Sequence, residues 1–131
     1  MIAFPVLFSC STNSPKNNNP YLPNYPVNVD VNMSLPSYSS LLYVSNAVYI
    51  PNQGVRGVIV FNSGSGYNAF DAACPNQALS SCSTMTIKGI NALCVCDNAE
   101  YSLFSGQCAG KQYLLKQYRV EVNGNLLHVY N

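Results

Sequence analysis

Histidine and charge of either sign are scarce in this sequence. His128 is the single histidine among 131 residues, and Asp, Glu, Lys and Arg together make up 8% of the chain. With a formal net charge of +1, the chain lacks the basic patch that holds a nucleic-acid backbone or an anionic membrane surface. The acidic residues are interpreted as solvated loop charges, and no histidine or nucleophile near them in the sequence completes an acid–base pair. They are Asp30, Asp71, Asp97, Glu100 and Glu121.

Long apolar segments and helical periodicity are also absent. The N-terminal apolar run is too short to span a bilayer as a helix, and no stretch keeps helical periodicity over three turns. Polarity comes instead from Asn, Ser, Gln and ten tyrosines. A surface poor in charge and rich in tyrosine is typical of protein interfaces, although exported proteins that use Asn and Ser for solubility would have the same composition. The first interpretation predicts a protein partner.

The cysteine content points to an oxidising compartment or a metal site, because the short chain has six cysteines. Leu7-Phe8-Ser9-Cys10 resembles a bacterial lipobox, in which the cysteine is lipidated. This predicts a signal peptide over residues 1–9 and a lipidated Cys10. The alternative is that Cys10 is a free, buried cysteine near an ordinary N-terminus.

Residues 10–26 are expected to form an extended tether, because they contain several prolines and an asparagine triplet without hydrophobic periodicity. Residues 11–26 would reach roughly 50 Å when extended. Tyr21, Leu22 and Tyr25 could instead pack on a neighbouring surface.

The domain is expected to begin at residue 27, where strict alternation starts. Val27, Val29, Val31 and Met33 lie on one face of a predicted strand. Gly- and Asn-containing turns such as Asn123-Gly124-Asn125 separate the runs that follow. An antiparallel all-β sandwich or barrel over residues 27–131 is therefore predicted. The later predicted strands cover residues 41–50, 55–61, 67–72, 84–88, 91–95, 117–122 and 126–130.

Two cysteine-bearing loops carry a family resemblance. Cys74-Pro75-Asn76 follows the segment YNAFDAA, and Cys94-Val95-Cys96-Asp97 follows INAL. This layout resembles a Rieske domain, whose Cys-x-His and Cys-x-x-His loops together hold a [2Fe–2S] cluster. The resemblance covers nearly all of residues 27–131 and is most specific at Ala-Phe-Asp-x-x-Cys-Pro. It implies a Rieske-like antiparallel β-sandwich with a cluster-binding-type subdomain.

The resemblance fails at the metal ligands. Asn76 and Asp97 stand where the family has histidines, and neither a neutral amide nor a hard carboxylate replaces an imidazole on this iron. One histidine in the whole chain cannot supply two imidazoles. The ligand positions Cys74, Asn76, Cys94 and Asp97 are therefore expected to be degenerate, with no cofactor. The alternative is an atypical [2Fe–2S] cluster held by Cys74, Cys94, Asp97 and Asn76, or completed by another chain.

The resemblance also implies a pairing of the cysteines. Cys74 and Cys94 should face each other as two ligands of one iron would, and should form a disulfide where iron is absent. Cys82 and Cys96 resemble the second, loop-bracing pair of many Rieske proteins, which leaves Cys108 unpaired. Pairings that use Cys108 stay open, because connectivity cannot be read from sequence. A zinc site built on Cys94, Cys96 and Asp97 would lack a fourth ligand.

These features lead to a functional expectation. The chain is similar to asparagine-rich Rieske-like lipoproteins of Bacteroidota, which implies a non-catalytic, cluster-free accessory or structural subunit of an outer-membrane complex, such as a protein-secretion translocon. It would be anchored by Cys10, facing the periplasm, and would bind protein rather than nucleic acid or a small substrate. The alternative is a periplasmic electron-transfer protein with the atypical [2Fe–2S] cluster.

Overall fold

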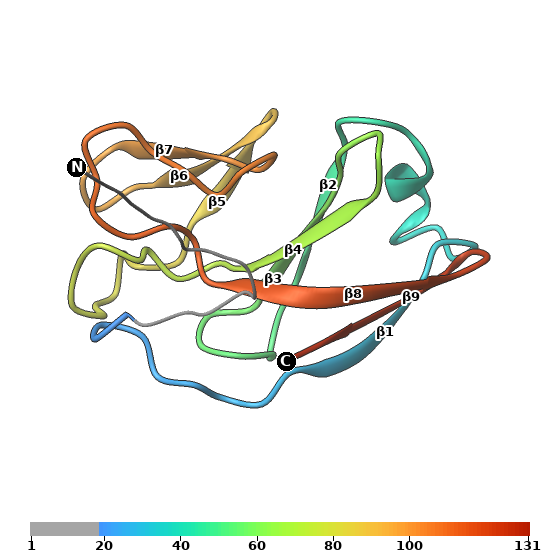
Figure 1. Cartoon of the computed structure of the whole chain (residues 1–131), viewed down its shortest axis with the longest axis horizontal. Helices are drawn as coiled ribbons and strands as arrows, with labels where there is room; N and C mark the ends of the chain where they lie inside the picture. The colour runs from blue at the N-terminus through green and yellow to red at the C-terminus, as the bar shows by residue number, and fades with distance from the viewer. Residues whose placement is uncertain (1–18) are drawn as a thin grey trace, which may run out of the picture.

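The computed structural model describes residues 19–131, and the predicted signal peptide and Cys10 lie outside the described residues. The described chain forms two antiparallel sheets (Figure 1), one with the strand order β1-β9-β8-β4-β3-β2 and one with the order β5-β6-β7. The elements are β1 (Asn28–Asn32), the 3₁₀ helix η2 (Ser39–Leu42), β2 (Ala47–Ile50), β3 (Val58–Asn62), β4 (Tyr67–Asp71), β5 (Thr86–Lys88), β6 (Asn91–Cys94), β7 (Ala99–Ser102), β8 (Gln117–Asn123) and β9 (Leu126–Tyr130).

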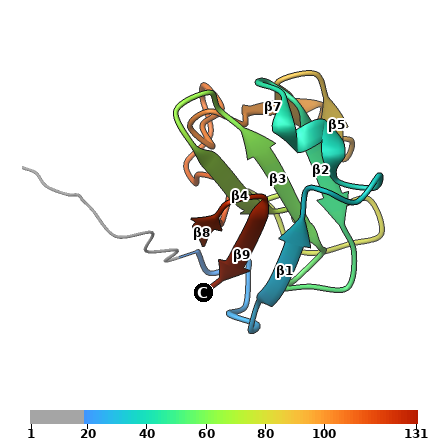
Figure 2. The same cartoon turned by 90° about the vertical axis from the view of Figure 1, so that its right-hand side faces the viewer.

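The larger sheet curls into a partial barrel (Figure 2). Its first strand, β1, has the predicted alternation, because Val31 and the flanking Val27 and Met33 are buried while Asn28 and Asp30 are exposed. Successive side chains of a strand point to opposite faces, so one face of β1 lies against the core and the other meets solvent. The hairpin between β8 and β9 also forms as predicted, with the positive φ that its turn requires at Gly124.

Strand β3 lies between two hydrophobic cores and is buried along its whole length. Val58 and Val60 contribute to the barrel core inside the curled sheet, whereas Ile59 and Phe61 contribute to an interface core between the two sheets. A strand buried on both faces needs a continuous apolar run rather than alternation, which explains the sequence Val-Ile-Val-Phe. The interface core consists of Ile59, Phe61, Phe70, Ala72, Cys74, Met85, Ala92, Cys94, Ala99, Tyr101, Leu103 and Leu115.

Two elements differ from the sequence prediction. The first half of the strand predicted over residues 41–50 is instead η2 followed by a bend, where the Asn62 side chain donates to the Leu41 carbonyl at 2.8 Å. Strand β7 is not among the predicted strands, because it directly follows the cysteine-bearing loop that ends at Asp97 and carries the family resemblance. It pairs with β6 and alternates buried Ala99 and Tyr101 with half-buried Glu100 and Ser102.

Residues 19–26 lie against the domain, which differs from the extended tether expected there. Leu22 is 4% exposed. The Asn24 side-chain oxygen accepts a hydrogen bond from Lys116 Nζ, and the Tyr25 carbonyl accepts one from Asn131 Nδ2 at 2.8 Å. The packed body of the protein therefore includes residues before residue 27.

Asp71 is buried, so its interpretation as a solvated loop charge was wrong. Its carboxylate accepts hydrogen bonds from the backbone nitrogens of Val55 (2.7 Å), Arg56 (3.0 Å) and Ala73 (2.9 Å), and from the Tyr118 hydroxyl at 2.6 Å. Burial and the neighbouring Asp71 carboxylate raise the pKa of Tyr118 far above its ordinary value, so Tyr118 stays a donor. Asp71 thus holds the loop between β2 and β3 against the end of β4.

No helix within residues 19–131 has the length and apolar character needed to cross a membrane.

Candidate functional site

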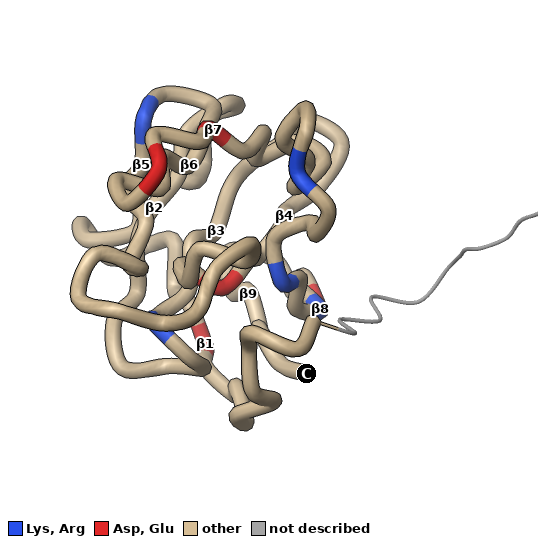
Figure 3. The backbone as a smooth tube through the Cα atoms, turned by 90° about the vertical axis from the view of Figure 1, so that its left-hand side faces the viewer, with Lys and Arg blue, Asp and Glu red and all other residues tan. Residues whose placement is uncertain are grey.

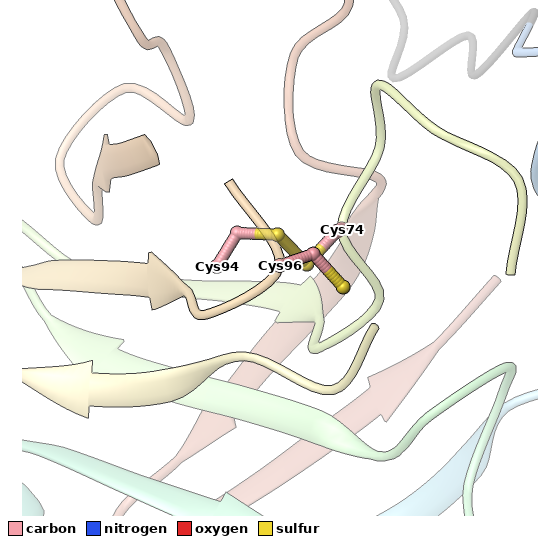
Figure 4. A group of neighbouring side chains, drawn as sticks. All are labelled: Cys74, Cys94 and Cys96. Carbon is pink, nitrogen blue, oxygen red and sulfur yellow. A yellow bond between two sulfur atoms is a disulfide. The ribbon is translucent and has the colours of Figure 1, made fainter. Parts of the chain in front are cut away.

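The two cysteine loops meet at the end of the molecule where β4 and β6 finish. Cys74 follows β4 of the larger sheet and Cys94 ends β6 of the smaller one, and their Sγ atoms are bonded in a disulfide with a Cα–Cα distance of 5.7 Å (Figure 4). Both residues are buried in the interface core, at 1% and 0% exposure. The disulfide implied by the resemblance is therefore present, and it joins the two sheets.

A second disulfide links Cys82 to Cys96, with a Cα–Cα distance of 5.3 Å. Both of these cysteines are half-buried, in contrast to the first pair. Among the described cysteines, Cys108 is the one without a disulfide, and its thiol lies 3.8 Å from the carbonyl oxygen of Ala109. The structure thus has the implied pairing rather than the alternatives that use Cys108.

The side chain of Asn76 has its hydrogen-bonding groups occupied. Its Nδ2 donates to the Tyr101 hydroxyl at 2.8 Å and to the Tyr113 carbonyl at 2.9 Å, and its Oδ1 accepts from the Tyr113 backbone nitrogen at 2.8 Å. Burial raises the pKa of Tyr101, although the hydrogen bond from Asn76 opposes this rise. The amide therefore ties the loop after β4 to the segment before β8.

Asp97 also has protein partners. Its carboxylate accepts from the Ala99 backbone nitrogen at 3.1 Å and forms an ion pair with Lys111 Nζ at 3.0 Å. Burial acts to raise the pKa of Asp97, but these hydrogen bonds and the charge of Lys111 outweigh it and hold the pKa below its ordinary value of 3.8. The ion pair connects the turn between β6 and β7 to the loop after β7.

Within the described part of the chain, one set of three potential metal-ligating side chains converges. The Sγ atoms of Cys74, Cys94 and Cys96 all lie within 4.8 Å of one another, and Asp97 is not part of this set. The zinc site considered on Cys94, Cys96 and Asp97 is therefore not assembled. His128 lies on β9, where its Nδ1 is 2.7 Å from an Asp30 carboxylate oxygen.

Sequence reasoning missed the partners of these side chains. Tyr113 and Asn76 are 37 positions apart, and nothing in the local pattern around either residue indicates their contact. The opposite charges of Lys111 and Asp97 favour an ion pair, because the chain has few other charges. Their separation of 14 positions, however, does not predict that the two side chains meet. Asn19, whose Nδ2 donates to the Pro75 carbonyl at 2.6 Å, lies in the segment interpreted as a tether.

Comparisons with known proteins agree with this geometry at the level of the fold. No family model and no curated protein matches the sequence. Among solved structures, a complex of reduced oxygenase and oxidized ferredoxin in carbazole 1,9a-dioxygenase matches with a TM-score of 0.50 and 15% identity, covering 86% of this chain and 94% of that one.

Two further structures match over similar lengths. The ferredoxin of carbazole 1,9a-dioxygenase from Nocardioides aromaticivorans IC177 has a TM-score of 0.50 and 15% identity, covering 80% of this chain and 96% of its own. A putative NADH-dependent nitrite reductase small subunit from Mycobacterium tuberculosis has a TM-score of 0.50 and 16% identity, covering 81% and 96%. With its curled antiparallel sheets and its paired cysteine loops at the ends of β4 and β6, the chain has the fold of the Rieske-type ferredoxins.

Proposed function

We propose that this protein is a cluster-free, non-catalytic Rieske-like binding module, held at the outer membrane by a lipid on Cys10 as an accessory or structural subunit of a larger complex. The observation that carries the proposal is the disulfide between Cys74 and Cys94. These are the positions from which a Rieske domain would offer its two thiolates.

The donor set at this site does not fit a Rieske cluster. Iron takes thiolate sulfur, and a cysteine sulfur already bonded to another sulfur is not a thiolate. The amide of Asn76 is engaged with Tyr101 and Tyr113, and Asp97 is paired with Lys111. Since His128 is the chain's single histidine, the two imidazoles of the family's centre cannot come from this polypeptide.

The surface favours a protein partner because it has few charges and several exposed apolar side chains. Charged residues are few and scattered along the backbone (Figure 3), so long-range electrostatics contribute little to binding. Leu79, Val95 and Leu114 are 36%, 48% and 54% exposed on three loops at the disulfide end. Exposed apolar side chains of this kind are common in contact surfaces, where a partner buries them. One of the matching structures is itself a complex of a ferredoxin with an oxygenase.

The position of Asn19, the first described residue, would orient an anchored domain relative to the membrane. Asn19 binds the carbonyl of Pro75, directly beside Cys74. Nine residue steps separate Cys10 from Asn19, and an extended chain covers at most about 30 Å over that length. A lipid on Cys10 would therefore hold the disulfide end close to the membrane, rather than letting the domain range over the 50 Å expected from the sequence. A membrane complex, such as a protein-secretion translocon, is the kind of partner that this end would meet.

The test is purification of the protein with its partners from native membranes, followed by iron and acid-labile sulfide analysis and electron paramagnetic resonance of the reduced sample. We expect co-purifying membrane proteins, lipid on Cys10 and no cluster. Stoichiometric iron and sulfide would overturn the proposal in favour of an electron carrier with an atypically ligated [2Fe–2S] cluster. Recovery of a lone monomer would remove the binding role.

A further inference from the structure

The two disulfides lie side by side at the end of β6. Cys94 and Cys96 are separated by one residue, and the Sγ atom of Cys96 lies within 4.8 Å of both sulfurs of the Cys74–Cys94 bond (Figure 4). Once the outer disulfide is opened, the Cys96 side chain is free to rotate, and its sulfur starts no more than 4.8 Å from either sulfur of the inner bond. Neither disulfide is isolated from the other.

The two disulfides differ in their access to solvent. The inner disulfide joins Cys74 and Cys94, which are 1% and 0% exposed. The outer disulfide joins Cys82 and Cys96, which are both half-buried. A dissolved or protein-borne dithiol therefore reaches the outer disulfide first, and cannot reach the inner one without displacing the interface core.

A hydroxyl group lies against the outer disulfide. Ser80 Oγ is 3.3 Å from the Sγ of Cys82 and 3.7 Å from the Sγ of Cys96. When this disulfide is opened, the hydroxyl can donate a hydrogen bond to a thiolate at either position, and stabilising the thiolate favours the form of cysteine that attacks disulfides. The structure thus places a thiolate-stabilising donor beside the sulfur that is nearest to the inner disulfide.

We propose that Cys96 is the exchange sulfur of an intramolecular thiol–disulfide relay, through which an external dithiol reduces the buried Cys74–Cys94 bond without touching it. The inference requires both disulfides, and it holds whether or not the protein is anchored or binds a partner.

The proposed relay consists of three thiol–disulfide exchange steps. An external dithiol reduces the outer disulfide, becomes a disulfide itself and leaves thiols on Cys82 and Cys96. The Cys96 thiolate then attacks one sulfur of the Cys74–Cys94 bond, forming a new bond to that cysteine and displacing the other as a thiolate, which takes up the proton that Cys96 released. Finally, the Cys82 thiolate attacks Cys96, restores the outer disulfide and releases the second inner thiol. The net result is one oxidised external dithiol and one reduced inner pair.

Two matched variants test the relay, Cys82→Ser and Cys96→Ser, each made in the full chain carrying Cys108→Ser. Both remove the outer disulfide, but the first leaves the Cys96 thiol beside the inner disulfide and the second leaves the Cys82 thiol. Each protein is quenched in acid and unfolded in acidic denaturant, which halts exchange and exposes the buried cysteines. Its free thiols are alkylated there with N-ethylmaleimide, and its cysteine linkages are mapped by mass spectrometry of non-reduced peptides.

We expect Cys82→Ser to contain molecules in which Cys96 is bonded to Cys74 or Cys94 and the displaced cysteine is alkylated. Cys96→Ser should keep the Cys74–Cys94 bond intact, with Cys82 as the alkylated thiol of the outer pair. In a second measurement with limiting dithiothreitol, alkylation of Cys74 and Cys94 should be at least about tenfold slower in Cys96→Ser than in the protein with both disulfides. Identical linkage maps, or identical rates of inner reduction, would overturn the relay.

Discussion

At the scale of single residues, the side chains at the two degenerate ligand positions are bonded to other residues of the same chain. Asn76 and Asp97 stand at the positions where the resemblance expects histidines, yet each is held by a residue from the segment between β7 and β8, Tyr113 and Lys111 respectively. Buried or half-buried polar groups are costly unless they are paired. These contacts within the chain stabilise the three loops around the disulfides.

The pair of Asp97 and Lys111 predicts an acid-sensitive contribution to stability. A carboxyl group whose pKa is lowered by folding stabilises the protein above its unfolded pKa, and this contribution is lost as pH falls through the folded pKa. Lys111→Met should raise the pKa of Asp97 and make the unfolding free energy depend less on pH in that acidic range. The measurement is an NMR titration of the Asp97 carboxyl together with denaturant unfolding at several pH values.

Lys88→Met is the matched control, because it removes the exposed ion pair between Lys88 and Glu100. It should leave the titration of Asp97 unchanged. An Asp97 that titrates at the same pH with and without Lys111 would show that the ion pair does not hold the two loops in solution.

At the scale of elements, the N-terminal segment behaves as part of the packed body. Leu22 is buried, and the ring of Tyr21 packs edge-on against that of Tyr113, with their centroids 6.1 Å apart. Tyr113 is also the partner of Asn76. The segment therefore braces the same loop that the amide of Asn76 holds.

Leu22→Ala should lower the unfolding free energy by about 3 kcal/mol, because it removes buried methyl groups and leaves a cavity. Tyr25→Ala is the control, since Tyr25 is 51% exposed and is held through its backbone carbonyl. It should change the unfolding free energy by less than about 0.5 kcal/mol. Chemical denaturation of both variants is the measurement, and equal, small effects would mean that residues 19–26 are a free tether after all.

At the scale of the whole molecule, the smaller sheet is fastened to the larger one by the interface core and by the inner disulfide. Cys74 follows β4 of the larger sheet, Cys94 ends β6 of the smaller one, and the two are 20 positions apart in the chain. The cross-link reduces the conformational entropy of the unfolded chain, and more so for a longer loop.

The double variant Cys74→Ala with Cys94→Ala should therefore lose about 3 kcal/mol of unfolding free energy in the chain-entropy model. Hydrogen exchange should detect the loss first in β5, β6 and β7, because the smaller sheet has fewer strands to hold it. Cys108→Ala leaves both disulfides in place and should change little. An unchanged denaturation midpoint in the double variant would contradict the cross-linking role.

Some of the fold is decided by local sequence. The alternation from Val27 to Met33 requires a strand with one buried face, and the turn at Asn123-Gly124-Asn125 supplies the positive φ of a tight hairpin. The Val-Ile-Val-Phe run of β3 likewise indicates a strand buried on both faces. The single histidine is a fact of composition that no fold alters. The cysteine pairing followed from the family resemblance and not from spacing alone.

Other features were decided by tertiary structure. Four features depend on residues that lie far apart in the chain or that lack a local pattern. They are the burial of Asp71, the ion pair of Asp97 with Lys111, the packing of Leu22 and the convergence of three sulfurs. Strand β7 is paired with β6, and residues 41–46 lie outside β2, with the Leu41 carbonyl accepting a hydrogen bond from the Asn62 side chain. Local periodicity reports which face of a segment is apolar. Which groups meet across the fold depends on how the two sheets pack, and that is set by the whole chain at once.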